Sequence, residues 1–292
     1  MRRRYFIILL GILLWGFNVN FIAVSSAESN KMEELEEVLL KSSQYCSKLA
    51  YAVLDFVCKE KVTIDFFAFD DRGALSRFEL HAALQHKNFG GGRRQLKYKA
   101  KELIYDYQLI SKDNKLIEQR ILLEVDGKKV SEESDEIEKV LPHSLLILGP
   151  IGLLSDYWQE RHDYKIKKKG RLLGEKIYVV EAVPKPGSTT KHLWGKIWVS
   201  QKDFSILKIE WNQESAEGYE SFVKEAKQSG FQPDFSLIAE YEYEKNGIRF
   251  PSKFVLEEYY RHPKYKLIKN SKKTVVYYNY KFFTVKTDVI VK

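Results

Sequence analysis

The sequence predicts a mainly β (α+β) protein built on an antiparallel sheet with an N-terminal helix. Apolar and polar residues alternate along several segments, as expected for strands that bury one face. Turn signals stand between several of these segments, which is typical of hairpins joined into a meander. Helix-like segments do not recur between successive strands, so a parallel doubly wound sheet is not expected.

The individual elements follow from local patterns. Residues 32–52 have helical spacing of apolar side chains, and residues 54–67 are rich in Val, Ile, Phe and Thr and predict a strand. Further strands are predicted at 103–109, 121–125, 207–211, 237–243 and 275–291, and helical segments at 74–87, 131–140, 144–159 and 218–229. Turns are predicted at Asp113-Asn114, Asp126-Gly127, 201–203 and Asn246-Gly247.

The N-terminus has the order of charges and apolar residues found in a secretory signal peptide. Three arginines, Arg2 to Arg4, precede an apolar run, and Ser25-Ser26-Ala27 supplies the small residues that signal peptidase recognises. We expect residues 1–27 to be removed, leaving a protein that is periplasmic or extracellular and has no integral membrane segment. The alternative is an uncleaved N-terminal anchor, because about 20 residues can span a bilayer.

The rest of the chain, residues 28–292, is predicted to form a single domain. Without the three signal arginines the formal net charge falls from +8 to +5, and 40 acidic residues are interspersed with the basic ones. A nucleic-acid partner is therefore not expected, since such proteins cluster their basic residues.

The two cysteines, Cys46 and Cys58, are predicted to form a disulfide, because an isolated pair in an oxidising compartment is usually bridged. A continuous helix between them would separate their Cα atoms by about 18 Å, at 1.5 Å per residue, which is too far to bridge. The chain would have to bend between them. Two buried free thiols are the alternative.

No catalytic or metal-binding motif is found. The chain lacks the motifs of serine hydrolases, zinc proteases, P-loops and dinucleotide-binding folds, so we expect neither an enzyme nor a cofactor. The six histidines do not have metal-ligand spacing. A calcium-like fragment, with Asp70, Gly73, Ser76 and Glu79, lacks two of its acidic ligands, so a metal is not expected either.

The segment 144–158 is apolar on nearly every side. Pro150 interrupts helical hydrogen bonding, so two short helical turns buried against a broad apolar surface are predicted. One interpretation is a helix that plugs the concave face of a curved sheet as part of the core. The other is a helix that lines or covers a cavity for an acyl chain, since apolar concave sites bind such ligands.

Two segments resemble a known family. Residues 195–210, GKIWVSQKDFSILKIE, are similar to a hairpin of the periplasmic outer-membrane lipoprotein-sorting proteins, the LolA-like superfamily. Residues 241–253, YEYEKNGIRFPSK, look like the next hairpin of that family, in which a strand restarts at G-(I/V)-x-(F/L)-P. The resemblance covers about residues 155–291, and 54–125 by strand pattern only, and it leaves 68–94 as a predicted insertion.

The resemblance implies a strongly curved antiparallel half-barrel with an N-terminal helix and short helices covering its concave face. The function that it implies is an envelope carrier that binds lipid or lipoprotein acyl chains between this sheet and the apolar helix. The alternative is a non-enzymatic sensor or scaffold of the same fold that binds a protein partner or a lipid signal. The candidate lining residues are Leu145, Leu146, Leu148, Ile151, Leu154, Trp158, Tyr105, Tyr107, Leu207, Ile209, Trp211, Tyr241 and Tyr243.

Overall fold

The structure is a computed structural model in which these residues are described: 29–50, 56–69, 95–112, 115–130, 148–187, 194–216, 219–228, 230–262 and 266–283. The predicted signal peptide, most of the predicted insertion at 68–94, the predicted helix at 131–140, and Leu145 and Leu146 lie outside these residues. The single-domain prediction therefore stays a prediction.

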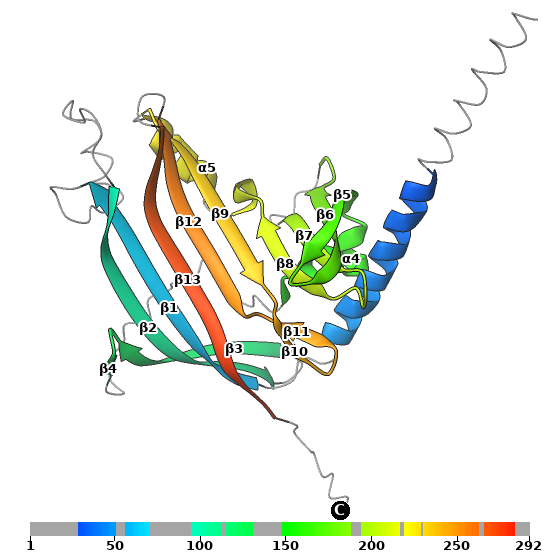
Figure 1. Cartoon of the computed structure of the whole chain (residues 1–292), viewed down its shortest axis with the longest axis horizontal. Coiled ribbons are helices and arrows are strands. Elements are labelled where there is room, and N and C mark those ends of the chain that lie inside the picture. Colours follow the sequence, from blue (N-terminus) through cyan, green and yellow to red (C-terminus); the bar gives the residue numbers. More distant parts are fainter. Residues whose placement is uncertain are drawn as a thin grey trace, which may run out of the picture.

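The described chain is dominated by one open antiparallel sheet of 11 strands (Figure 1). The strands are β1 (Phe56–Phe69), β2 (Gln95–Lys112), β3 (Lys115–Val125), β4 (Lys128–Lys129), β5 (His162–Leu172), β6 (Glu175–Pro184), β7 (Gly195–Ser200), β8 (Ile206–Trp211), β9 (Gln232–Glu240), β12 (Lys253–His262) and β13 (Lys266–Phe282). Their order is β4-β3-β2-β1-β13-β12-β9-β8-β7-β6-β5, which leaves β4 and β5 as the two edges. The predicted fold class is confirmed.

Most neighbours in the sheet are also neighbours in sequence, as a meander requires. There are two exceptions: β13 returns to pair with β1, so that Val62 lies opposite Val275, and β9 pairs with β12. A short hairpin, β10 (Tyr243–Lys245) with β11 (Ile248–Phe250), forms a second sheet between β9 and β12. The sheet twists strongly, and β3 crosses the lower ends of β1 and β2 (Figure 1).

The tight turns are made by residues with positive φ angles. Asp126-Gly127 and Asn246-Gly247, both predicted as turns, have φ angles of 49° and 77°, and 55° and 74°. The turn between β5 and β6 was missed by the sequence analysis. There Leu173 has a φ of 51° before Gly174, and leucine is not a usual turn residue.

The helices are short except for the first. An N-terminal helix covers residues 29–50, close to the predicted 32–52, and α5 (Tyr219–Gln228) matches the predicted helix at 218–229. The predicted 144–159 helix is two turns, α3 (Ile151–Leu154) and α4 (Asp156–Gln159), and a 3-10 turn, η2 (Gln213–Ser215), follows β8. Pro150 stands before α3, and the break between α3 and α4 falls at Ser155, whose ψ is 155°.

The two faces of the sheet differ in chemistry. We call the face whose side chains join the main apolar cluster the inner face. Outward-facing strand residues form cross-strand ion pairs, such as Glu257 with Lys269 at 2.8 Å and with Lys272 at 3.2 Å. Burial alone would raise the pKa of Glu257, but the hydrogen bonds from Lys269, Tyr259 and Lys272 outweigh it and lower the pKa to about 2.

Candidate functional site

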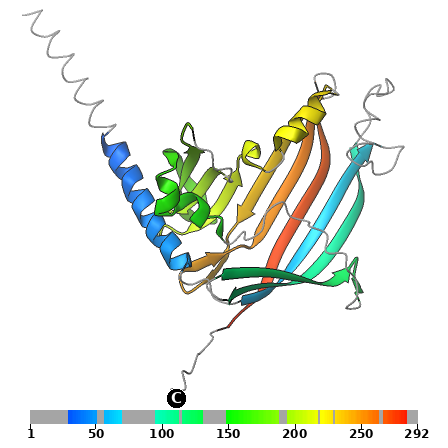
Figure 2. The same cartoon turned by 180° about the vertical axis from the view of Figure 1, so that it is seen from behind.

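A helical cover packs on the inner face of the sheet. The name denotes the N-terminal helix together with α3 and α4, which lie beside β5–β8 in both views (Figures 1 and 2). Val38, Cys46 and Leu49 share one side of the N-terminal helix and are at most 1% exposed. On α3, Leu153 and Leu154 are 0% exposed. These side chains join one apolar cluster with inner-face residues of the sheet.

Polar contacts hold the cover together. Gln159 Nε2 of α4 donates to the carbonyl oxygen of Leu39 at 2.8 Å, and Ser43 Oγ donates to Asp156. Cys46 Sγ lies 3.4 Å from the carbonyl oxygen of Pro150. The N-terminal helix is thus bonded directly to both short helices, and the three helices form one layer.

Separate contacts join this layer to the sheet. On β5, Tyr164 donates its hydroxyl to the carbonyl oxygen of Leu153. His162 Nδ1 lies 2.8 Å from the carbonyl oxygen of Trp158. On β6, Tyr178 donates to Glu34 at 3.3 Å. Each of these three bonds uses a side chain of the sheet. In two of them the acceptor is a backbone carbonyl group of the cover.

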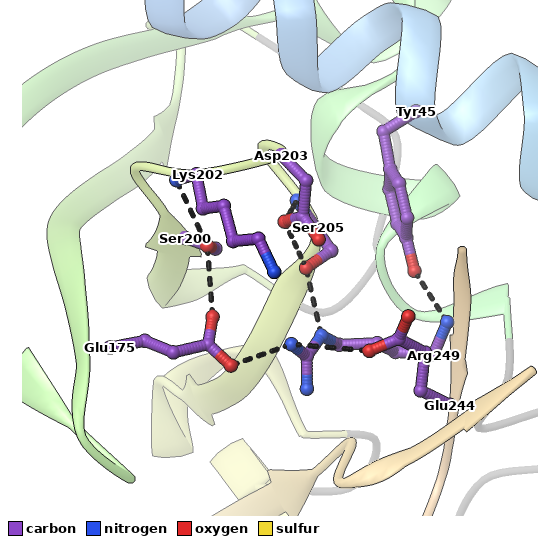
Figure 3. A network of polar contacts seen from close by, with 8 residues as sticks. All are labelled: Tyr45, Glu175, Ser200, Lys202, Asp203, Ser205, Glu244 and Arg249. Carbon is purple, nitrogen blue, oxygen red and sulfur yellow. Dashed lines mark hydrogen bonds and ion pairs between the residues drawn. The ribbon is translucent and has the colours of Figure 1, made fainter.

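A buried arginine on β11 connects three parts of the fold (Figure 3). Arg249 is 7% exposed. Its Nε donates to Ser205 Oγ at 2.8 Å, and its Nη2 donates to Glu175 Oε1, also at 2.8 Å. The backbone N–H of Arg249 donates to the Tyr45 hydroxyl at 3.0 Å. One residue therefore contacts the start of β6, the turn after β7 and the N-terminal helix.

The partners of Arg249 are themselves ordered by hydrogen bonds (Figure 3). Ser200 Oγ donates to the second oxygen of Glu175 at 3.0 Å, and Ser205 Oγ donates to Asp203 at 2.6 Å. Burial opposes ionisation of Asp203, but the hydrogen bonds from Ser205 and the charge of Arg249 lower its pKa. The Arg249 guanidinium is therefore held in place by the side chains of Glu175 and Ser205, and Ser205 is held by Asp203. We call this arrangement the Arg249 network.

The two segments that resemble lipoprotein-sorting proteins meet in this network. Ser200, Asp203 and Ser205 belong to the first segment, and Arg249 belongs to the second, directly after the Asn246-Gly247 turn. The sequence analysis did not single out Arg249. No sequence signal marked it, because the tertiary structure alone buries all three residues of β11. A charged residue between two buried apolar residues requires a partner.

Most of the predicted lining residues are brought together. Tyr105, Tyr107, Leu154, Ile209, Trp211 and Tyr241 are all buried members of the main apolar cluster, and Leu148 and Ile151 pack against it, partly buried. The candidates on β2, β8 and α3 thus share one interior although they are far apart in sequence. Their role in binding a ligand stays a prediction.

Three predicted lining residues are placed differently. Leu207 packs in a second cluster with Ile177 and Val179, because the register between β7 and β8 shifts after Trp198 and turns Leu207 away from the main cluster. Tyr243 is 37% exposed. Trp158 is half-buried, and its ring contacts Tyr157 and His162.

The predicted disulfide is not formed. Cys46 and Cys58 are both buried free thiols, which is the alternative that the sequence left open. Cys46 contacts the carbonyl oxygen of Pro150, the residue directly before α3. Cys58 lies on the inner face of β1, opposite Tyr107 of β2. Burial raises the pKa of Cys46 to about 12. Both thiols therefore behave as packed apolar groups.

A second group of buried charges lies on the inner face at β1 and β3. The Glu60 side chain is 1% exposed and accepts hydrogen bonds from Arg120 at 2.5 Å and 3.1 Å. Arg120 also pairs with Glu118 at 3.2 Å, and Tyr107 donates its hydroxyl to Glu118 at 2.8 Å. Burial raises the pKa of Tyr107 well above its usual value. No pattern in the sequence indicated this pair, because Glu60 stands between two lysines as a surface residue would.

Neither a membrane-spanning helix nor a group of metal ligands is present in the described part of the chain. No helix there is both long and apolar enough to cross a membrane. No group of three or more His, Cys, Asp or Glu side chains in these residues is arranged to hold a metal ion.

Comparison with known proteins gives matches in structure only. No protein-family model matches the chain. No curated protein matches it at a significant level. Among solved structures, a LolA superfamily protein from Nitrosomonas europaea is 13% identical, with 88% of this chain and 97% of the other covered and a TM-score of 0.35.

Two further structures match in the same way. A DUF1329 family protein from Desulfovibrio piger is 13% identical over 86% of this chain and 93% of the other, with a TM-score of 0.35. A domain described as an outer membrane lipoprotein-sorting protein, from Vibrio parahaemolyticus, is 9% identical over 85% and 94%, also with a TM-score of 0.35. Likeness at this level says nothing about what this chain binds.

Proposed function

We propose that this chain is an exported, non-enzymatic envelope protein that holds acyl chains between the inner face of its sheet and the helical cover. The observation that carries the proposal is a single apolar cluster. The sheet contributes the residues on one side of this cluster, and the cover contributes those on the other. Apolar sites between a sheet and a helical layer are suited to acyl chains, because such ligands are recognised by buried apolar area.

The construction of the cover supports this proposal. The helices α3 and α4 have four residues each, and helices of that length are not stable by themselves. Their position therefore depends on packing and on the bonds from Tyr164 and His162 to their carbonyl groups. An acyl chain that entered the cluster would replace apolar contacts between the sheet and the cover by similar contacts with the ligand. Burial of apolar surface contributes about 25 cal/mol per Å² in both kinds of contact.

The Arg249 network would set the closed position of the cover. Tyr45 accepts a hydrogen bond from the backbone of Arg249, while the Arg249 side chain is fixed by Glu175 and Ser205. Movement of the N-terminal helix away from the sheet breaks the bond to Tyr45 and leaves the ion pair of Arg249 intact. The helix can therefore open without leaving a buried charge unpaired, which removes one cost from the opening.

Mass spectrometry of an organic extract tests the proposal. Protein purified without detergent from the envelope of an expressing bacterium should release acyl lipids in a fixed molar ratio. An unrelated exported protein of similar charge, purified in parallel, should release none. A lipid-free preparation that carries a stable protein partner would contradict the carrier function and favour the sensor or scaffold. The same sample should begin at Glu28, and intact residues 1–10 would contradict cleavage.

A further inference from the structure

One buried hydrogen-bond donor of the interior has no partner among the residues that the structure describes. Trp211, the last residue of β8, is 5% exposed, and its indole Nε1 makes no hydrogen bond. The residue belongs to the main apolar cluster, and its cross-strand neighbours are Gly195 on β7 and Leu237 on β9. The indole therefore packs within the main apolar cluster.

An orphaned donor of this kind is unusual in a folded interior. Buried polar groups are almost always hydrogen-bonded, and one without a partner destabilises the fold. An indole N–H can only donate, so the missing partner must be a hydrogen-bond acceptor. Ser42 Oγ, on the buried side of the N-terminal helix, is a second buried polar atom without a partner. Both sides of the apolar cluster thus carry a polar atom that the protein leaves unbonded.

We infer that the acyl ligand supplies the acceptor for Trp211, through the carbonyl oxygen of an ester-linked or amide-linked acyl chain. This inference rests on the proposed function. A carbonyl oxygen fits better than a phosphate or a carboxylate, because a charged group placed among apolar side chains would require a counter-ion, whereas a neutral carbonyl requires only a donor. Trp211 then fixes how far the chain enters, since the carbonyl marks the end of the hydrocarbon.

A pair of lipids that differ only in their carbonyl groups tests this inference. The probes are two fluorescent phosphatidylglycerols with equal chains, one with ester links and the other with ether links. Their affinities are measured for the wild-type protein, for Trp211→Phe, and for Trp198→Phe as a matched control. Trp198 is half-buried on the opposite side of β7, where the Lys208 ammonium lies 4.6 Å from its ring centroid.

The wild-type protein should bind the ester lipid about 3- to 10-fold more tightly than the ether lipid, as expected for one buried hydrogen bond. Trp211→Phe should remove this preference by weakening the ester lipid alone, and Trp198→Phe should keep it. Equal wild-type affinities for the two lipids would overturn the inference and leave the proposed function standing. A preference that survives in Trp211→Phe would also overturn it. Binding of neither lipid by the wild-type protein would overturn the proposed function and the inference together.

Discussion

Replacing Arg249 by alanine should destabilise the protein by about 2–4 kcal/mol. The side chain is 8% exposed and makes two hydrogen bonds of 2.8 Å, to Ser205 and Glu175. A hydrogen bond to a charged group contributes about 1.5–3 kcal/mol, and removal of one partner from a fully buried ion pair costs about 3–5 kcal/mol. Glu175 is 30% exposed, so water can solvate it after the change, and the expected loss lies below the upper figure.

Urea unfolding measures this loss, and hydrogen exchange shows where it occurs. The exchange of amides in residues 29–50 should accelerate in Arg249→Ala, because loss of the side-chain bonds to Ser205 and Glu175 loosens the β11 backbone, whose N–H at position 249 donates to Tyr45. The control is Arg261→Ala, since Arg261 is 58% exposed and pairs with Asp234 at the surface, where the expected loss is about 0–1 kcal/mol. Equal losses in the two variants, or unchanged exchange in the N-terminal helix, would refute the role given to the network.

Three further experiments have defined expected results. Arg120→Ala leaves Glu60 buried without its cation and should lower the unfolding free energy by about 3–5 kcal/mol in urea; a loss below about 1 kcal/mol would mean that water reaches Glu60. Cys46 and Cys58 should both react with a thiol reagent after denaturation and should resist it in the native protein, whereas a bridged pair would release no thiol until reduced. Because the folded pKa of Glu257 is lowered from 4.5 to about 2, its stabilisation is present above pH 4.5 and is lost as the pH falls towards 2. Glu257→Gln should therefore flatten the acid limb of the stability curve, and identical limbs would contradict this.

The sequence predicted the local elements of the fold better than their connections. The Val, Ile, Phe and Thr content of residues 54–67 predicted β1, and the alternation in residues 103–109 predicted β2. Asn246-Gly247 predicted a turn whose φ angles are positive. These signals depend only on neighbouring residues. The pairing of β13 with β1 joins the first and the last strand of the described chain in the middle of the sheet, and it has no local signal. The position of Ser155 as the break between α3 and α4 was also missed, since Pro150 can begin a helix as well as interrupt one.

The candidate site was predictable in its apolar part and not in its charged part. The alternation of Tyr105 and Tyr107 placed both on one face of β2, which became the inner face. Leu207 failed this rule because a register shift moved it into the second cluster. Arg249 and Glu60 resembled solvent-exposed residues in the sequence, and only the tertiary arrangement buried them. The disulfide between the two cysteines was predicted from the expected oxidising compartment alone. The fold instead places the two thiols beside different neighbours.

Quenching of tryptophan fluorescence by a brominated acyl chain tests most directly whether the ligand lies between sheet and cover. Bromine quenches an indole only at close contact, so the result reports position as well as binding. Two proteins are needed: in one Trp211 is the sole tryptophan, and in the other Trp198 is, with the remaining tryptophans replaced by phenylalanine. The account predicts saturable quenching of Trp211, which belongs to the main cluster, and none of Trp198, which packs on the second cluster. Equal quenching of both, or quenching of Trp198 alone, would contradict it.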